Sequence, residues 1–243
     1  DPARHIGVPS IPLLWDVQPA VEAVRWCVDN GLKAVMIPTL WGEHDPYHHT
    51  KYDPFWAACE EMGVIVHFHS GPAPHQEYFG AGFPVEDKRD VLPGAMGIYC
   101  SEVMWWLYRP LTFMIWGGVF ERFPKLKTMI VEGGTMFMLP SWLRLMDFHY
   151  TEGQISAKLG NFRKHLALKP SEYFQRNIGI GASCVLRPDL EGRDDIGLEK
   201  IMWGSDFPHP EGSWPNTAQY FKDNFSNFPE QDGRKILGEN AIN

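Results

Sequence analysis

The feature that most constrains the fold of this chain is an alternation of short apolar runs with longer amphipathic stretches. Six apolar runs predict strands, at residues 6–14, 32–38, 64–69, 126–132, 177–184 and 200–206. Helical patterns separate most of them, at 17–30, 53–62, 101–123, 141–149, 217–227 and 231–240. The helix at 53–62 is expected to begin with Asp53 as its N-cap. Strands that alternate with helices indicate βαβ units and a parallel sheet.

Composition excludes several classes of protein. With 44% hydrophobic and 21% charged residues, the chain of 243 residues is neither disordered nor collagen-like. No run approaches the roughly 18 apolar residues of a membrane span, and no secretory leader is visible. The net charge is −8 and no Lys/Arg cluster occurs, which argues against nucleic-acid binding. Four cysteines without C-x-x-C spacing are typical of a reduced, cytoplasmic protein. We therefore expect one cytoplasmic domain over 1–243 with no nucleic-acid or membrane partner.

Candidate catalytic side chains stand at the ends of predicted strands. His69, Glu132 and Asp206 each close an apolar run. In parallel α/β folds the functional site is built at the carboxyl ends of the strands. A Gly/Pro-punctuated segment at about 70–100 predicts a long active-site loop. Six strands fall short of the eight in a complete barrel. The fold class we expect is therefore α/β, a (β/α)₈ TIM barrel that lacks one or two N-terminal βα units.

The segment VIVHFHSG (64–71) carries the first candidate metal ligands. Side chains two residues apart on a strand share a face, so His67 and His69 point the same way. Histidine is the commonest metal ligand near neutral pH, and two imidazoles on a rigid strand form half of a Zn²⁺, Mn²⁺ or Fe²⁺ site. The alternative is that one or both are buried core histidines held by hydrogen bonds.

Two carboxylates end other predicted strands. Asp206 closes KIMWGSD and precedes a Pro-rich turn that contains His209. It is a candidate metal ligand or general base, or a cap of the turn that follows. Glu132 precedes two glycines, which permit close backbone approach. Glu132 is a candidate for orienting a ligand, for acting as a base or for holding substrate; a structural salt bridge is the alternative.

Further polar residues gather in predicted loops. The cluster of His44, His48 and His49 favours a pocket rim or a solvated loop over a ligand cage. His75, on the long loop, is a candidate to reach over the site, with a solvated position as the alternative. Arg176, before the fifth predicted strand, could bind a substrate carboxylate bidentately; a surface ion pair is the alternative.

These motifs together resemble the amidohydrolase-2 family. Its members are metal-dependent TIM-barrel hydrolases and non-oxidative decarboxylases, among them the aminocarboxymuconate-semialdehyde and resorcylate decarboxylases. The matching pieces run in family order and cover nearly the whole chain. They are DPARHIGVPSIPL, GLKAVMIP, DPFWAACEEMGVIVHFHSG, FPKLKTMIVEGG with LPSWLRLMD, IMWGSDFPHPEGSWP and KILGENAIN.

Carried over residue by residue, the resemblance implies that His69 is the metal ligand at the end of barrel strand five. Asp206 is then the ligand and proton-transfer carboxylate at the end of strand eight, with His67 behind them. Two departures stand out. The strand-one His-x-His of the family is absent from this sequence, and Glu132 stands where the decarboxylases carry a substrate-contacting histidine. The second departure shifts weight from decarboxylation towards hydrolysis.

The expected function is that of a metal-dependent hydrolase or non-oxidative decarboxylase. It would act on a small carboxylated or amide-bearing molecule through a metal-activated water or a metal-bound carboxylate. The expected cofactor is one divalent ion, Zn²⁺ first, with Mn²⁺ or Fe²⁺ as alternatives. The residues expected to move protons or to surround the substrate are Asp206, Glu132, His67, His75, Arg176, His209, Trp41 and Trp203, with Phe207 and Trp214 completing an aromatic wall.

Two further expectations concern partners. The helix at 101–123, with Trp105, Trp106, Ile115 and Trp116, carries more apolar surface than one face of a barrel helix needs, which predicts a homodimer through it. The rival to an enzyme is a non-catalytic barrel, a binding or scaffold protein without its metal, because the ligand set in this sequence is incomplete.

Overall fold

The fold is built on a sheet of parallel strands in sequential order, β1-β2-β3-β4-β5. The computed structural model describes residues 5–39, 41–70, 95–133, 138–152, 160–183 and 185–242. The strands are β1 (Ala34–Ile37), β2 (Ile65–His69), β3 (Thr128–Val131), β4 (Ile178–Ser183) and β5 (Ile201–Gly204). Every neighbouring pair is parallel, so all carboxyl ends meet at one edge of the sheet. This order confirms the α/β, barrel-type βα architecture that the alternation predicts.

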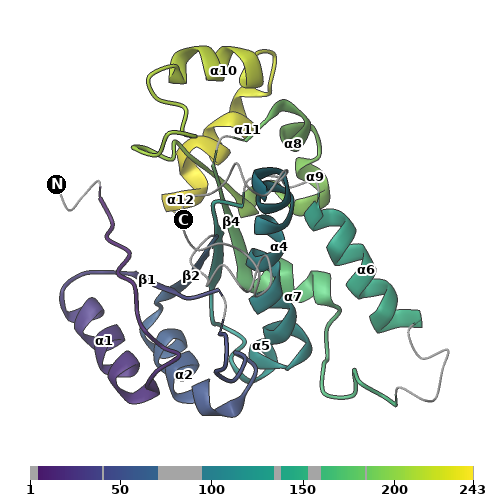
Figure 1. Ribbon diagram of the computed structural model, residues 1–243. Helices are drawn as coiled ribbons and strands as arrows, with labels where there is room; N and C mark the ends of the chain where they lie inside the picture. The colour runs from purple at the N-terminus through teal and green to yellow at the C-terminus, as the bar shows by residue number, and fades with distance from the viewer. Residues whose placement is uncertain are drawn as a thin grey trace.

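Helices flank the strands, with α1 and α2 beside β1 and β2 and α4 to α7 on the other side (Figure 1). The C-terminal helical turns pack on β5. Among the described residues, no helix has both the length and the apolarity that crossing a membrane requires. The α-helices are α1 (Val17–Asp29), α2 (Asp53–Met62), α4 (Ala95–Trp116), α5 (Val119–Arg122), α6 (Met138–Glu152), α7 (Pro170–Asn177), α8 (Arg187–Glu191), α9 (Arg193–Ile196), α10 (Thr217–Phe225), α11 (Glu230–Arg234) and α12 (Asn240–Ile242). Single turns are η1 (Thr50–Tyr52), η3 (Leu198–Lys200) and the π-helical η4 (Lys235–Glu239).

One predicted strand is reduced to a single bridge. Within 6–14, Ser10 pairs in parallel with Met36 of β1, where the Met36 N–H donates to the Pro9 carbonyl (2.9 Å) and the Ile11 N–H donates to the Met36 carbonyl (2.7 Å). Proline has no N–H to donate, so Pro9 and Pro12 limit the ladder to this point.

Burial alternates along the three central strands, β2, β3 and β4. On one face Phe68, Ile130 and Ile180, in register on these strands, are at most 1% exposed and belong to the hydrophobic core. The opposite face, which includes His67 and Met129, is half-buried. In a TIM barrel one face of the strands lines the barrel interior. The predicted strands are almost continuously apolar. In the described residues of β2, β3 and β4, however, one of the two faces is fully buried and the other is only half-buried.

The starts of α2 and α4 differ from the predicted ones. Tyr52 is the N-cap of α2, and Asp53 is its first residue, with its carboxylate turned to Arg122. Helix α4 begins at Ala95, inside the predicted loop of 70–100, whose residues 71–94 lie outside the described part. It runs through Pro110 and ends at Gly117-Gly118, where the φ of Gly118 is 71°. A glycine adopts this left-handed conformation without steric cost.

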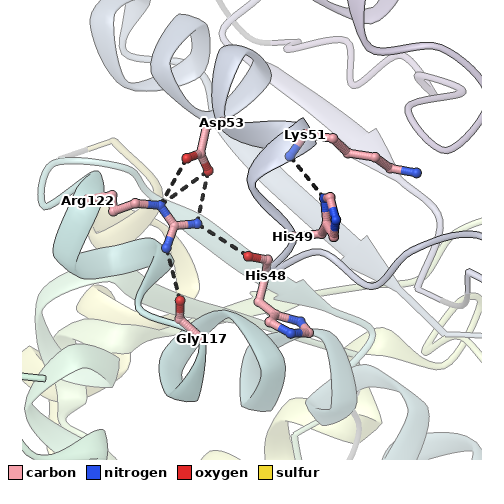
Figure 2. A network of polar contacts seen from close by, with 6 residues as sticks. All are labelled: His48, His49, Lys51, Asp53, Gly117 and Arg122. Atoms are coloured by element: carbon pink, nitrogen blue, oxygen red, sulfur yellow. Dashed lines mark hydrogen bonds and ion pairs between the residues drawn. The ribbon is translucent and has the colours of Figure 1, made fainter. Parts of the chain in front are cut away.

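The guanidinium of Arg122 joins three other segments of the chain (Figure 2). Arg122 donates to both carboxylate oxygens of Asp53, to the carbonyl of Gly117 (2.9 Å) and to the carbonyl of His48 (3.4 Å). Nearby, the Lys51 N–H donates to Nδ1 of His49 (3.1 Å). Arg122 thereby connects the start of α2, the end of α4 and the loop before η1.

The contact between Gly117 and His48 generates a stability prediction. A Cβ on Gly117 would lie 2.2 Å from the Cβ of His48 and 2.7 Å from the Phe113 carbonyl, so Gly117→Ala forces the loop away from α4. Overpacking of this kind costs about 1–3 kcal/mol of unfolding free energy. Gly97→Ala is the matched control, because nothing lies within 4 Å of its added Cβ. Urea unfolding followed by tryptophan fluorescence measures both, and equal midpoints would contradict the packing.

Candidate metal centre

A cavity of about 560 Å³ opens at the carboxyl edge of the sheet. Four strands end at it: β2 contributes His69 and is followed by Ser70, Glu132 follows β3, Ser183 ends β4, and Asp206 follows β5. The remaining lining residues are Tyr99, Cys100, Val103 and Met104 of α4, with His209 and Glu211 from the loop after β5. The sheet therefore brings together side chains that lie up to 137 positions apart in the sequence, from His69 to Asp206.

Glu132, Asp206 and His209 form the centre of the cavity. One ligand-type atom of each lies within 4.8 Å of the other two. Nδ1 of His209 is 3.2 Å from Oδ2 of Asp206. The carboxylates are mostly buried, with side-chain exposures of 20% for Glu132 and 19% for Asp206. Two carboxylates and an imidazole at this spacing suit a divalent cation.

Both carboxylates sit on an unusual backbone. Glu132 has φ 59° and Asp206 has φ 57°, the left-handed region that residues other than glycine rarely adopt. Each stands just past the end of its strand, where the chain turns sharply away. Such conformations cost about 1–3 kcal/mol and cluster at functional sites. Among the described residues, Asn227 (φ 60°) is the third non-glycine residue with this backbone, and the other two are the carboxylates that converge.

The loop after β5 holds His209 against the strand end. The His209 N–H donates to the Asp206 carbonyl (2.8 Å), and the Ser213 N–H donates to the Ser205 carbonyl (3.1 Å). A Cβ on Gly212 would lie 2.7 Å from that Ser205 oxygen, so only glycine fits there. The i,i+3 spacing of Asp206 and His209 is thus fixed by a compact turn.

Ser70 connects the ends of β2 and β3. Its buried hydroxyl donates to Oε2 of Glu132, and its carbonyl accepts a hydrogen bond from Nδ1 of His69 (2.6 Å). A proton on Nδ1 leaves Nε2 of neutral His69 with its lone pair available. Nδ1 of His69 is 3.6 Å from Oε2 of Glu132, so His69 borders the three residues at the centre.

The electrostatics of the cavity favour a bound cation. Two ionised carboxylates this close repel one another unless a cation or a proton lies between them. Burial, together with the carboxylates of Glu132 and Glu211, raises the pKa of Tyr99, which keeps its phenol protonated at neutral pH. On β2, burial lowers the pKa of His67 to about 4, so His67 is neutral at pH 7. The residues present therefore fit a divalent metal.

Several residues expected at the site lie elsewhere. Arg176 is at the amino end of β4, where it donates to the Phe120 carbonyl (2.5 Å) and to Oδ1 of Asn177 (2.9 Å). Trp41 is buried against Phe113, and Trp203 packs on Phe221, so neither lines the cavity.

The aromatic wall is not seen at the cavity, whose apolar lining in the described residues is Val103 and Met104. Phe207 and Trp214 pack edge to face on each other and are 62% and 66% exposed. His75 lies outside the described residues.

Sequence reasoning missed seven lining residues: Ser70, Tyr99, Cys100, Val103, Met104, Ser183 and Glu211. The position of Ser70 directly after a strand-end histidine was a usable signal. Tyr99 carried none, because it belongs to a stretch that the glycines and prolines around it predict as a loop.

The family model Amidohydro_2, described as amidohydrolase, matches residues 1–243. The chain belongs to the amidohydrolase family. The resemblance that the motifs indicate is thereby confirmed.

Among its relatives, 2-amino-3-carboxymuconate-6-semialdehyde decarboxylase of Dictyostelium discoideum is 25% identical over 261 residues, covering 100% of this chain and 61% of that protein.

Solved structures show the same architecture. An amidohydrolase from Mycobacterium avium subsp. paratuberculosis superposes with a TM-score of 0.74 at 27% identity, over 97% of this chain and 56% of that one. A 5-carboxyvanillate decarboxylase from Novosphingobium aromaticivorans, with bound manganese and 3-methoxy-4-hydroxy-5-nitrobenzoic acid, gives a TM-score of 0.74 at 18% identity, over 99% and 64%. The neighbours are amidohydrolase TIM barrels, and the chain spans about 56–64% of the length of these two.

The bridging role of Ser70 generates a prediction for this amidohydrolase. Removing a group that orients a metal ligand costs about 10–100-fold in metal affinity, so Ser70→Ala should weaken Mn²⁺ binding by that factor. Ser183→Ala is the matched control, because it removes a hydroxyl from the same cavity without touching Glu132. Isothermal titration calorimetry on chelator-treated protein measures both, and equal affinities in the two variants would contradict the role of Ser70.

Proposed function

We propose that this chain carries the metal centre of a hydrolase or non-oxidative decarboxylase that acts on a small carboxylated or amide-bearing organic molecule. The observation that carries the proposal is the convergence of Glu132, Asp206 and His209 within 4.8 Å at the carboxyl edge of a parallel sheet. Membership of the amidohydrolase family and the decarboxylase names of its relatives support it.

The proposed cofactor is one divalent metal ion. Asp206, Glu132 and His209 would hold it, with Nε2 of His69 as the nearest further imidazole. Carboxylate and imidazole ligands serve both Zn²⁺, which the sequence predicts, and Mn²⁺, which is bound in the Novosphingobium enzyme. When bound, such an ion polarises a substrate oxygen and lowers the pKa of water.

The residues of the chain supply the remaining chemistry. Asp206 faces the cavity with Oδ2 near His209 and is placed to move a proton. Ser70 donates a hydrogen bond to Oε2 of Glu132 and so fixes the orientation of that carboxylate at the centre. Tyr99 lines the same cavity, where burial raises the pKa of its phenol.

Glu132 also bears on the choice of reaction. It occupies the position where the family resemblance expects the substrate-contacting histidine of a decarboxylase. The described lining of the cavity holds Glu132, Asp206 and Glu211 and contains neither arginine nor lysine. An amide or ester group meets less charge repulsion there than a carboxylate does. We therefore place hydrolysis before decarboxylation.

Turnover of paired substrates tests the proposal. We expect the protein, purified without chelator, to contain one divalent ion per chain by plasma mass spectrometry and to hydrolyse aryl amides or esters in preference to releasing CO₂ from aryl carboxylates. Asp206→Asn should lower turnover by about 10²–10⁴-fold, whereas Ser183→Ala should leave it near the wild-type rate.

Two results would contradict the proposal. Wild-type turnover in Asp206→Asn would remove the proposed proton transfer. A protein that contains no metal and turns over neither substrate would favour the non-catalytic barrel.

Helix α4 exposes less apolar surface for the predicted homodimer than the sequence indicates. Ile115 is 1% exposed and Trp106 and Trp116 are half-buried, so of these four residues only Trp105 is largely open, at 48%. Self-association through α4 stays a prediction, and a monomer in light scattering at micromolar concentration would refute it. The cytoplasmic location and the single domain over 1–243 likewise stay predictions.

A further inference from the structure

A groove runs along the outer side of α4, away from the metal centre. Its first part, about 310 Å³, lies between α4 and α6, which are neighbours in Figure 1. Its second part, about 320 Å³, reaches the loop that carries His48. Thr112, Phe113 and Trp116 line both parts, so the two form one continuous surface. None of the groove residues lines the cavity at the strand ends.

The groove contains one cation in an aromatic cage. The guanidinium carbon of Arg109 lies 4.8 Å from the ring centre of Trp41, 5.3 Å from that of Trp106 and 5.6 Å from that of Phe113. These rings are favourable neighbours for a guanidinium but accept no conventional hydrogen bond. In the part of the chain that the structure describes, no carboxylate or carbonyl accepts from Arg109. As far as the described residues go, the N–H groups of Arg109 are therefore available to an anion.

The rest of the lining is mostly apolar and aromatic. Trp105 and Leu145 form the open rim, 48% and 53% exposed, and Trp142 and Met146 form the buried floor. A volume near 300 Å³ is at the lower end for small-molecule sites, which combine apolar walls with a few placed polar groups. Arginine recognises a planar carboxylate through two parallel hydrogen bonds. A ligand that satisfies both features has an aromatic body and one carboxylate.

We propose that the α4 groove binds a small aryl carboxylate, with its carboxylate on Arg109 and its ring against Trp105, Phe113 and Trp116. The site is separate from the metal centre, and it stands whether or not the proposed enzymatic function does. Helix α4 borders both, through Tyr99, Cys100, Val103 and Met104 on one side and the groove residues on the other.

The test uses 2-naphthoate as the probe and 2-naphthamide as its uncharged counterpart, titrated calorimetrically into the full chain in the presence of chelator. We expect the naphthoate to bind at least about tenfold more tightly than the amide, the factor that a charge-assisted hydrogen-bond pair supplies. Arg109→Gln should reduce the affinity for naphthoate to that for the amide. Equal affinity of wild type for the two probes would overturn the proposal.

Two variants at the rim of the groove test the site even if Arg109→Gln does not fold. Leu145 is 53% exposed, so Leu145→Glu and Leu145→Lys leave the core intact and differ only in the charge placed beside the groove. Leu145→Glu should weaken naphthoate binding and Leu145→Lys should preserve or strengthen it. Equal affinities in this pair would contradict the site.

Two controls test where the probe binds and whether a second copy of the chain covers the groove. Loss of naphthoate binding in Asp206→Asn would place the probe in the metal cavity and overturn the proposal; unchanged binding in that variant supports it. A wild-type dimer in sedimentation that Leu145→Glu dissociates would show a second copy seated on the groove, which also overturns it.

Discussion

The candidate metal centre depends on the convergence of two side chains of like charge. Glu132 and Asp206 follow β3 and β5, which are separated only by β4. Parallel strands in sequential order bring both ends to the same edge, and β4 has glycine at positions 179 and 181 of the face it shares with the metal centre. A Cβ on Gly179 would lie 2.6 Å from Sδ of Met129, so the glycine leaves room for that side chain beside β4. At the carboxyl end of β4, Ser183 lines the same cavity as the two carboxylates.

The residues around Glu132 and Asp206 hold the two carboxylates in place and do not remove the repulsion between them. Ser70 holds one oxygen of Glu132, and the turn closed by Gly212 holds His209 beside Asp206. Left-handed backbone at both carboxylates adds strain that a cation would offset through ligand bonds. On the other side of α4, Arg109 is a cation whose described neighbours are aromatic rings. Helix α4 thus lies between a cavity lined by carboxylates and a groove that contains an arginine.

The sequence predicted what periodicity and strand order determine. Five strands, helix α2 from Asp53 to Met62 and the strand-end positions of His69, Glu132 and Asp206 all follow from apolar runs that alternate with helical ones. What it could not predict depends on three-dimensional contacts. Arg176 was a plausible carboxylate binder until the structure placed it at the amino end of β4. Trp203 is a large aromatic residue close in sequence to Asp206, as a residue of a pocket wall would be. In the structure it lies on β5 and its ring packs against Phe221. The helices α7 to α9 are short and polar, so no apolar period marks them.

Anomalous diffraction from crystals soaked in Mn²⁺ tests the central claim most directly. We expect one peak within bonding distance of Glu132, Asp206 and His209, at about 2.0–2.3 Å from their ligand atoms, and no such peak in crystals of Asp206→Asn. Manganese located away from Glu132, or retained unchanged in Asp206→Asn, would contradict this metal centre.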